Sequence, residues 1–150
     1  MKDTNTVSAP RIWVVLAKAY KAMSLFVEQR VSKEGLCLSD FMVLEVLLHK
    51  GPLTISAIGE KVLLANASMT SAIDRLENKK LVVRKNDKED RRIRRVELTA
   101  KGESFIAEIY QRHEAEIESL MTGIPFEERT ALHSSLKKLG LAAAAANEHG

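Results

Sequence analysis

The sequence predicts one mainly α-helical domain that carries a small β-hairpin. The chain has 150 residues, which is about the usual length of a single domain. Hydrophobic residues make up 45% and charged residues 29%, so the chain has enough apolar side chains to bury a core. Most apolar residues recur at helical spacing, and β-favouring residues with strand-like alternation are confined to residues 81–99.

A single cysteine, Cys37, excludes a disulfide-stapled scaffold and is typical of a reducing compartment. The first ten residues contain no apolar stretch that could serve as the core of a signal peptide. No window reaches the roughly 18 uninterrupted apolar residues of a membrane span. We therefore expect a cytoplasmic protein that does not contact a membrane.

Charge is unevenly distributed along the chain. Residues 79–95 contain nine basic and three acidic side chains, a net charge of +6 within a chain whose total is +3. Residues 102–150 contain four basic and eight acidic side chains, a net charge of −4. This asymmetry predicts a basic surface for a polyanion beside an acidic region with a different task.

The N-terminal part predicts two helices. Apolar residues at helical spacing favour one long helix over residues 11–31, which Gly35 would end. Ser39 is a candidate N-cap for a second helix, which is too apolar to be exposed. The turn-forming pair Gly51 and Pro52 should end this second helix.

Two shorter helices should follow. Thr54 can cap the first and Asn66 can cap the second. In the second helix an apolar stripe repeats at the spacing i, i+4, i+7 through Met69, Ile73 and Leu76. The opposite face carries small or polar residues and one guanidinium, namely Ser68, Ser71, Ala72 and Arg75.

The remaining elements are a charged hairpin and two helices. Residues 81–83 and 96–99 favour strands, with a polar turn over residues 86–92 between them. Thr99 can cap a following amphipathic helix. A break at Gly123 and Pro125 precedes a final helix with leucines at i, i+4 and i+7, Leu132, Leu136 and Leu139.

Two short helices followed by a basic hairpin form, in this order, a winged helix-turn-helix, here flanked by long N- and C-terminal helices. The polar-faced helix can enter a DNA major groove, which is about 12 Å wide, and present its first residues to base edges. The hairpin arginines can bind phosphates or enter the minor groove, whose negative potential attracts guanidinium groups.

The stretch from Leu38 to Gly102 resembles the MarR (multiple antibiotic resistance regulator) family of bacterial transcription factors. The resemblance is carried by LSDFMVLEVLLHKGPLTISAIGEKV, SMTSAIDRLENKKLVVRKND and KEDRRIRRVELTAKG. Its most specific part is the wing signature Asp90-Arg91-Arg92 followed by Val96-x-Leu98-Thr99-x-x-Gly102. Lys80 departs from the pattern, because the family usually has glycine there. A non-glycine residue in the left-handed conformation would cost about 1 kcal/mol.

The resemblance implies an obligate homodimer whose first and last helices intertwine. Residues 1–36 would form the N-terminal dimerisation helix, 37–100 the DNA-binding domain and 101–150 the C-terminal dimerisation helices, all in one structural unit. It also implies a pseudo-palindromic operator in double-stranded DNA and, usually, repression. Many members release DNA when a phenolic ligand binds or a cysteine is oxidised.

Candidate DNA contacts are the polar face of the recognition helix and the wing arginines, namely Ser68, Thr70, Ser71, Arg75, Arg91, Arg92 and Arg94. Arg92 matches the wing-tip arginine of the family, which enters the minor groove; otherwise it is a solvated turn residue. Arg75 alternatively forms an intrahelical pair with Asp74, Glu77 or Asn78. Asp90 should stabilise the wing by pairing with a nearby arginine, because a carboxylate near phosphate is repelled.

Cys37 lies between the first two predicted helices, where the family has its ligand pocket and some redox cysteines. Gly35 to Phe41 also resembles the quinone- and catechol-responsive branch. A pocket for a small phenolic or aromatic effector would be lined by Met23, Phe26, Phe41 and Tyr110. The alternatives are a buried structural cysteine and ordinary core residues.

Other functions have weaker support. The four histidines lack metal-ligand spacing, and neither a phosphate-binding loop nor a nucleophile elbow occurs, so we expect no metal, no cofactor and no enzyme. A thiol peroxidase using Cys37 would lack a resolving cysteine. A winged-helix protein-interaction module is the main alternative. Such interfaces are enriched in aromatic residues, which the polar helix face lacks.

Overall fold

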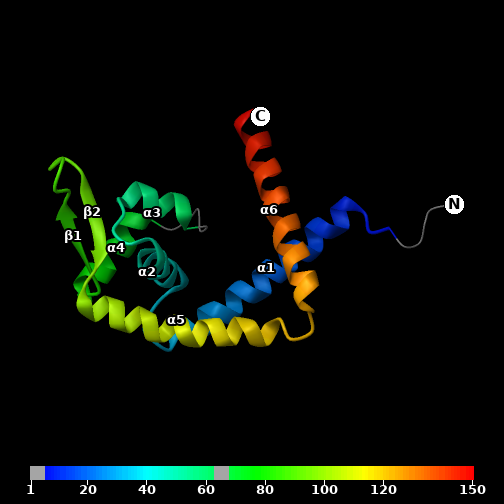
Figure 1. The fold of residues 1–150 in the computed structure, drawn as a ribbon, viewed down its shortest axis with the longest axis horizontal. Coiled ribbons are helices and arrows are strands. Elements are labelled where there is room, and N and C mark those ends of the chain that lie inside the picture. The colour runs from blue at the N-terminus through cyan, green and yellow to red at the C-terminus, as the bar shows by residue number, and fades with distance from the viewer. Residues whose placement is uncertain (1–5, 63–67) are drawn as a thin grey trace. The chain divides into compact units, whose positions relative to one another are not determined.

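The computed structural model describes residues 6–62 and 68–150 (Figure 1). It confirms the mainly α-helical fold with one hairpin. The elements are α1 (Ala9–Ser32), α2 (Leu38–Lys50), α3 (Ile55–Lys61), α4 (Met69–Asn78), β1 (Val82–Asn86), β2 (Arg94–Leu98), α5 (Ala100–Leu120) and α6 (Phe126–Glu148). The chain divides into a larger compact unit that ends at Gln111 and a smaller one, Arg112–Gly150. No helix within the described ranges is long and apolar enough to cross a membrane.

Short-range hydrogen bonds set the predicted helix starts at two threonines. The Thr54 side chain accepts a hydrogen bond from the Ala57 amide at 3.1 Å, and the Thr99 side chain accepts one from the Gly102 amide at 3.0 Å. The prediction for Ser39 is wrong, because α2 begins at Leu38 with Cys37 at the N-cap position, and Ser39 is buried inside the helix. Asn66 lies outside the described residues.

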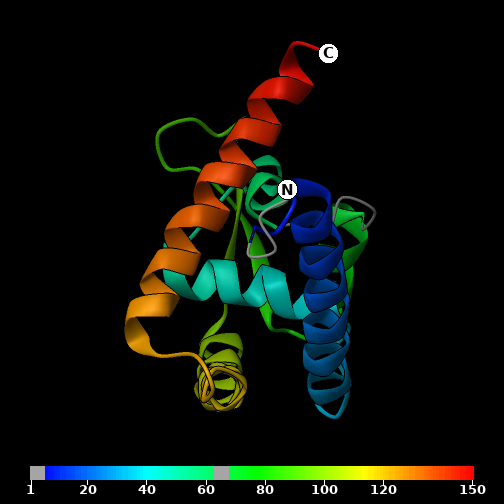
Figure 2. The ribbon, with the colours of Figure 1, turned by 90° about the vertical axis from the view of Figure 1, so that its right-hand side faces the viewer.

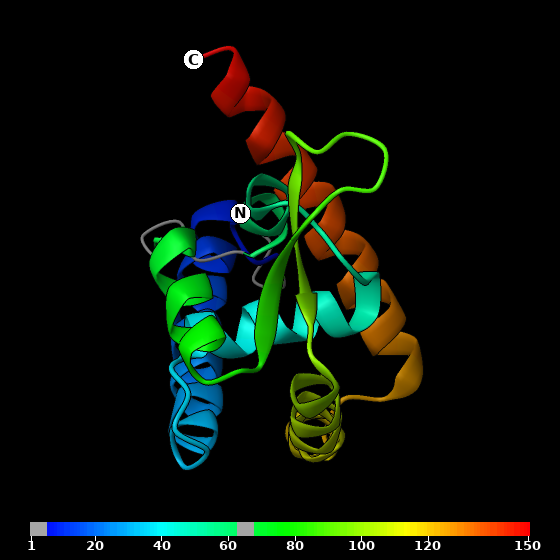
Figure 3. The same ribbon diagram turned by 90° about the vertical axis from the view of Figure 1, so that its left-hand side faces the viewer.

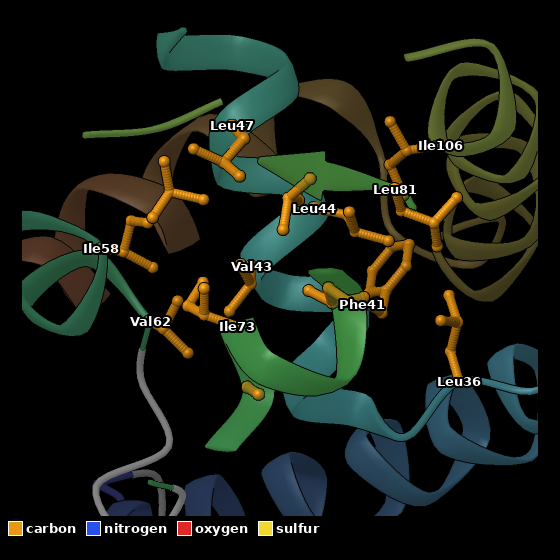
Figure 4. Packing of buried hydrophobic residues seen from close by; sticks show 14 of the residues in the cluster. Leu36, Phe41, Val43, Leu44, Leu47, Ile58, Val62, Ile73, Leu81 and Ile106 are labelled. Carbon is orange, nitrogen blue, oxygen red and sulfur yellow. The ribbon is translucent and has the colours of Figure 1, made fainter. Parts of the chain in front are cut away.

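The core of the larger unit lies between α2, α3 and α4 (Figure 4). α2 runs crosswise to α1 (Figure 2), and its Phe41, Val43 and Leu44 are almost completely buried. Ile58 of α3 and Ile73 of α4 face the same cluster. Each Å² of apolar surface that these side chains remove from water stabilises the fold by about 25 cal/mol. Their burial therefore holds the three helices against one another.

The hairpin is longer than the sequence predicted. β1 and β2 pair antiparallel from Val82 opposite Leu98 to Asn86 opposite Arg94. Pairing extends into charged residues because alternate side chains of a strand can point to water while the backbone remains bonded. Figure 3 shows the two strands of the hairpin side by side. Leu53, in the turn before α3, exchanges two backbone hydrogen bonds with Val96 in the middle of β2 and so joins the hairpin to the segment between α2 and α3.

α4 ends in a Schellman motif that uses lysine instead of glycine. Lys80 has the left-handed conformation, with φ at 62°. Its amide donates to the Glu77 carbonyl at 2.9 Å, and the Leu81 amide donates to the Leu76 carbonyl at 3.0 Å. Leu76 and Leu81 are both buried, so the hydrophobic contact of the motif compensates for the strain at Lys80.

Candidate nucleic-acid interface

The N-terminal half of α4 presents a polar face. Thr70 and Ser71 are exposed, whereas Ile73 and Leu76 lie in the core. Ala72, which the sequence placed on the outer face, is fully buried; its methyl group is small enough to widen the packed stripe. Ser68 is exposed and acts as the N-cap, with its Oγ accepting a hydrogen bond from the Ser71 amide at 3.3 Å. The helix therefore offers hydroxyl groups at its amino end.

Arg75 forms an ion pair with another helix. Its Nη2 and Nε atoms donate to one carboxylate oxygen of Asp40 in α2, at 2.9 and 3.3 Å. The predicted alternative of a pair within α4 is therefore wrong, because the partner lies 35 positions away in the sequence. The hydrogen bond with Asp40 raises the pKa of Arg75 above its ordinary value. The guanidinium remains a permanent cation with 45% of its side chain exposed.

Cys37 lies beside this ion pair. Its Sγ is 3.1 Å from the Ser39 hydroxyl and accepts a hydrogen bond from Arg75 Nη2 at 3.7 Å. The thiol is exposed on the single chain, so Cys37 is not part of this chain's own core. The cation near the thiol comes from α4, a neighbour that the local sequence around residue 37 does not predict.

Arg84 of β1 joins the hairpin to α4, a role that the sequence reasoning missed. Its two terminal nitrogens donate to Asp74 at 2.6 Å and to Glu77 at 2.8 Å. The hydrogen bond with Asp74 raises the pKa of Arg84. Asp74 and Glu77 lie on one face of α4, three residues apart, a spacing that could have indicated a shared cation. The hairpin is thus fixed directly to α4.

The turn of the wing is organised by two aspartates. Asp87 accepts hydrogen bonds from the side chain of Arg95 and from the Asp90 amide, and both lower its pKa. Asp90 binds the guanidinium of Arg92 at 3.1 Å and also accepts from its amide, which lowers the pKa of Asp90. The Arg92 side chain is nevertheless 92% exposed.

Two further wing arginines carry exposed charge. Arg91 and Arg94 are exposed and make no ion pair with another residue of the described ranges. Their guanidinium groups are therefore free to bind phosphate oxygens.

The candidate effector residues have different surroundings. Phe41 is buried in the core, and the Phe26 ring is covered by the Arg30 guanidinium at 3.3 Å. Tyr110 packs edge-to-face against His49, and Met23 is half-buried on α1. Two open surface cavities of about 320 Å³ have other linings: one includes Glu45, His49 and Lys61, and the other includes Leu47, Pro52 and Glu103.

This geometry suits an extended polyanion. A polar helix end and exposed arginines lie on the surface of the larger compact unit, and hydrogen bonds from Arg84 of β1 to Asp74 and Glu77 join the hairpin to α4. Helix N-termini and arginines are the groups that bind DNA phosphates and base edges.

Known proteins are similar to this chain in sequence and in fold. The model of the MarR family matches residues 36–93. The HTH-type transcriptional regulator MhqR of Bacillus subtilis is 36% identical over 136 residues, covering 91% of this chain and 94% of the relative.

Solved structures have the same fold as this chain. BpsR of Bordetella bronchiseptica, whose DNA binding is regulated by 6-hydroxynicotinic acid, superposes with a TM-score of 0.75 at 25% identity and covers 87% of this chain and 98% of its own. AbsC of Streptomyces coelicolor has a TM-score of 0.80 at 21% identity, with 95% and 99% covered. The chain therefore belongs to the MarR family of winged-helix, DNA-binding transcriptional regulators.

Proposed function

We propose that the protein is a repressor that binds a pseudo-palindromic operator as a homodimer. The observation that carries this proposal is the exposed amino end of α4, fixed beside a wing that carries exposed arginines. One chain offers one recognition helix, so two-fold symmetric reading requires two copies. The half-sites would lie about one helical turn apart, roughly 34–36 Å.

Dimerisation is supported by the apolar side chains that α1 and α6 leave exposed. In α1 these are Ile12, Trp13, Val14, Val15, Tyr20 and Leu25; in α6 they are Phe126, Leu132, Leu136, Leu139 and Leu141. Exposed apolar patches of this extent mark association surfaces. The proposal assigns residues 1–36 and 101–150 to dimerisation and residues 37–100 to DNA. A stable monomer in sedimentation at micromolar concentration would contradict it.

The proposed DNA contacts divide by location. Ser68, Thr70, Ser71 and Arg75 would meet bases and phosphates in the major groove. Arg91 and Arg94 would bind phosphates, and Arg92 would enter a narrow, A·T-rich minor groove. Asp90 holds the turn from which Arg92 projects.

Selection of bound duplexes from a random pool tests the operator. The selected sequence should be an inverted repeat, and Arg92→Ala should bind it about tenfold more weakly or worse at equal salt, with Arg75→Ala comparable. Lys18→Ala, which removes the same charge from an exposed site on α1, serves as the control. Arg92→Ala binding as tightly as the parent would refute the wing assignment.

We also propose that a phenolic or quinone-like ligand, or modification of Cys37, releases the operator. The thiol is exposed and touches the arginine of the recognition helix, so a bulky adduct there would displace Arg75. The regulation of BpsR by a hydroxylated aromatic acid supports the effector class. The proposed non-covalent site is near Met23, Phe26, Phe41 and Tyr110. The effector must prefer the state that does not bind DNA.

The two routes of release are separable by one variant. Operator affinity is measured with and without a catechol or a quinone, for the parent and for Cys37→Ser. Loss of the response in Cys37→Ser supports thiol sensing, whereas a retained response supports the non-covalent pocket. If neither protein responds at millimolar levels, the sensor proposal fails and the DNA-binding proposal remains.

A further inference from the structure

The ion pair between Asp40 and Arg75 joins a buried acid to an exposed base. The Asp40 side chain is only 3% exposed, whereas that of Arg75 is 45% exposed. The acid belongs to α2 and the base to α4, the helix that would read DNA. A charge so deeply buried is tolerated because a partner and its hydrogen bonds compensate for the lost hydration.

The geometry constrains the orientation of the guanidinium. Nε and Nη2 both donate to the same oxygen, Oδ1 of Asp40, and Nη2 also donates to Cys37 Sγ. Two donors on one acceptor restrict rotation of the planar group about its last bonds. Contacts with the described residues leave the Nη1 hydrogens available for a further acceptor. The side-chain entropy that an arginine loses on binding has thus been lost largely before DNA arrives.

Asp40 also has a local role, which accounts for only part of this arrangement. It lies in the first turn of α2, where a carboxylate interacts favourably with the helix dipole. That role does not require a partner on α4. A second bond also ties α4 to the turn between α1 and α2, since Lys79 Nζ donates to the Gly35 carbonyl at 2.6 Å. Arg75 of α4 and Lys79, the C-cap residue that follows this helix, are therefore both held by the same short segment, residues 35–40.

We infer that Asp40 is a positioning residue that determines DNA specificity by holding Arg75 in one orientation against the operator. This inference rests on the proposed function of α4 as the recognition helix. Asp40 is expected to touch no base itself. Without it, Arg75 remains a cation that attracts any phosphate, but it no longer favours the one base or phosphate that the fixed orientation selects.

The test compares two duplexes, the one that the parent selects from a random pool and a scrambled duplex of the same composition, at one salt concentration. Asp40→Asn keeps the shape of the side chain and removes its charge. We expect the ratio of the two affinities to fall about tenfold, because operator binding weakens while binding to the scrambled duplex is retained. Glu45→Gln is the matched control, since it removes one negative charge from the same helix and should preserve the ratio.

A double-mutant cycle shows whether Asp40 acts through Arg75. In an Arg75→Gln background, Asp40→Asn should cause no further fall in the ratio. Arg75→Lys provides a second measurement that leaves the buried acid in place. It retains the charge but loses the two-donor geometry, so the ratio should also fall about tenfold with an unchanged salt dependence. Thermal unfolding monitors the fold of each variant.

The outcomes separate the inference from the proposed function. If the parent selects no sequence, the proposed function fails and the inference fails with it. If the parent selects a sequence but Asp40→Asn or Arg75→Lys keeps the full ratio, only the inference is overturned. An equal effect of Asp40→Asn with and without Arg75 also overturns it, because the acid would then act on the fold alone.

Discussion

Helices α4 and α6 carry similar apolar patterns but differ in burial. In α4, Ile73 and Leu76 are fully buried against α2 and α3. In α6, Leu132, Leu136 and Leu139 repeat at the same kind of spacing, yet the helix has no buried residue. The comparison teaches that an amphipathic pattern predicts that a face will be covered, but not which chain supplies the cover. We propose that a second copy covers α6.

We expect the largest difference in stability between alanine substitutions at two glycines that both lie inside helices. A Cβ atom at Gly102 would lie 1.9 Å from the backbone oxygen of Leu81, whereas one at Gly140 in α6 meets nothing within 4 Å. Gly102→Ala should destabilise the protein by at least about 4 kcal/mol, because backbone cannot move aside as a side chain can.

Gly140→Ala is the matched control. It should stabilise α6 by up to about 1 kcal/mol, since alanine is the better helix former. Both values come from denaturant unfolding at one protein concentration. A folded Gly102→Ala protein with parental stability would show that the start of α5 can move away from Leu81.

The next largest change in stability should come from truncating an apolar residue to alanine in α4 or in α6. Ile73→Ala should lower the free energy of unfolding by about 3 kcal/mol at every protein concentration, because it leaves a cavity in the core. Leu136→Ala should instead weaken association, and its loss of stability should diminish as concentration rises. Sedimentation equilibrium and unfolding at two concentrations distinguish the two. Equal, concentration-independent losses would contradict the proposed role of α6.

Replacing lysine by glycine just after α4 and inside α6 should change the free energy of unfolding by a smaller amount. At Lys80 the change relieves a left-handed backbone, so we expect a gain of about 0.5 kcal/mol after the entropy of the unfolded chain is included. At Lys138, inside α6, the same change should cost about 1 kcal/mol. If both substitutions change the free energy of unfolding in the same direction, Lys80 is not strained.

The smallest effect concerns the pH dependence of the wing. The hydrogen bond from Arg95 lowers the pKa of Asp87 below its ordinary value of 3.8. A lowered pKa in the folded state means that this pair stabilises the wing above about pH 3.8, and that the contribution is lost as pH falls below it. An NMR titration of the Asp87 carboxyl should show a higher pKa in Arg95→Gln. An unchanged pKa would exclude this pair as the cause.

Much of the fold was predictable because its signals are local. Thr54 and Thr99 cap helices through hydrogen bonds that span three residues, and such bonds follow from neighbouring residues alone. The hairpin position was correct, but its length was not, because backbone pairing continues where charged side chains face water. The proposed roles of the wing and helix residues in DNA binding stay predictions.

The sequence by itself determined the helices, the hairpin and the basic segment, since periodicity, caps and charge depend on residues close together in the chain. Only the tertiary structure decided that Arg75 meets Asp40 and Cys37, and that Leu53 pairs with Val96. These partners are separated by tens of residues. Arg75 also has acids close to it in the sequence, Asp74 and Glu77, so the sequence alone does not show that it binds Asp40. Which acid it binds depends on how α2 and α4 pack, and that packing is set by the shapes of all the side chains buried between them.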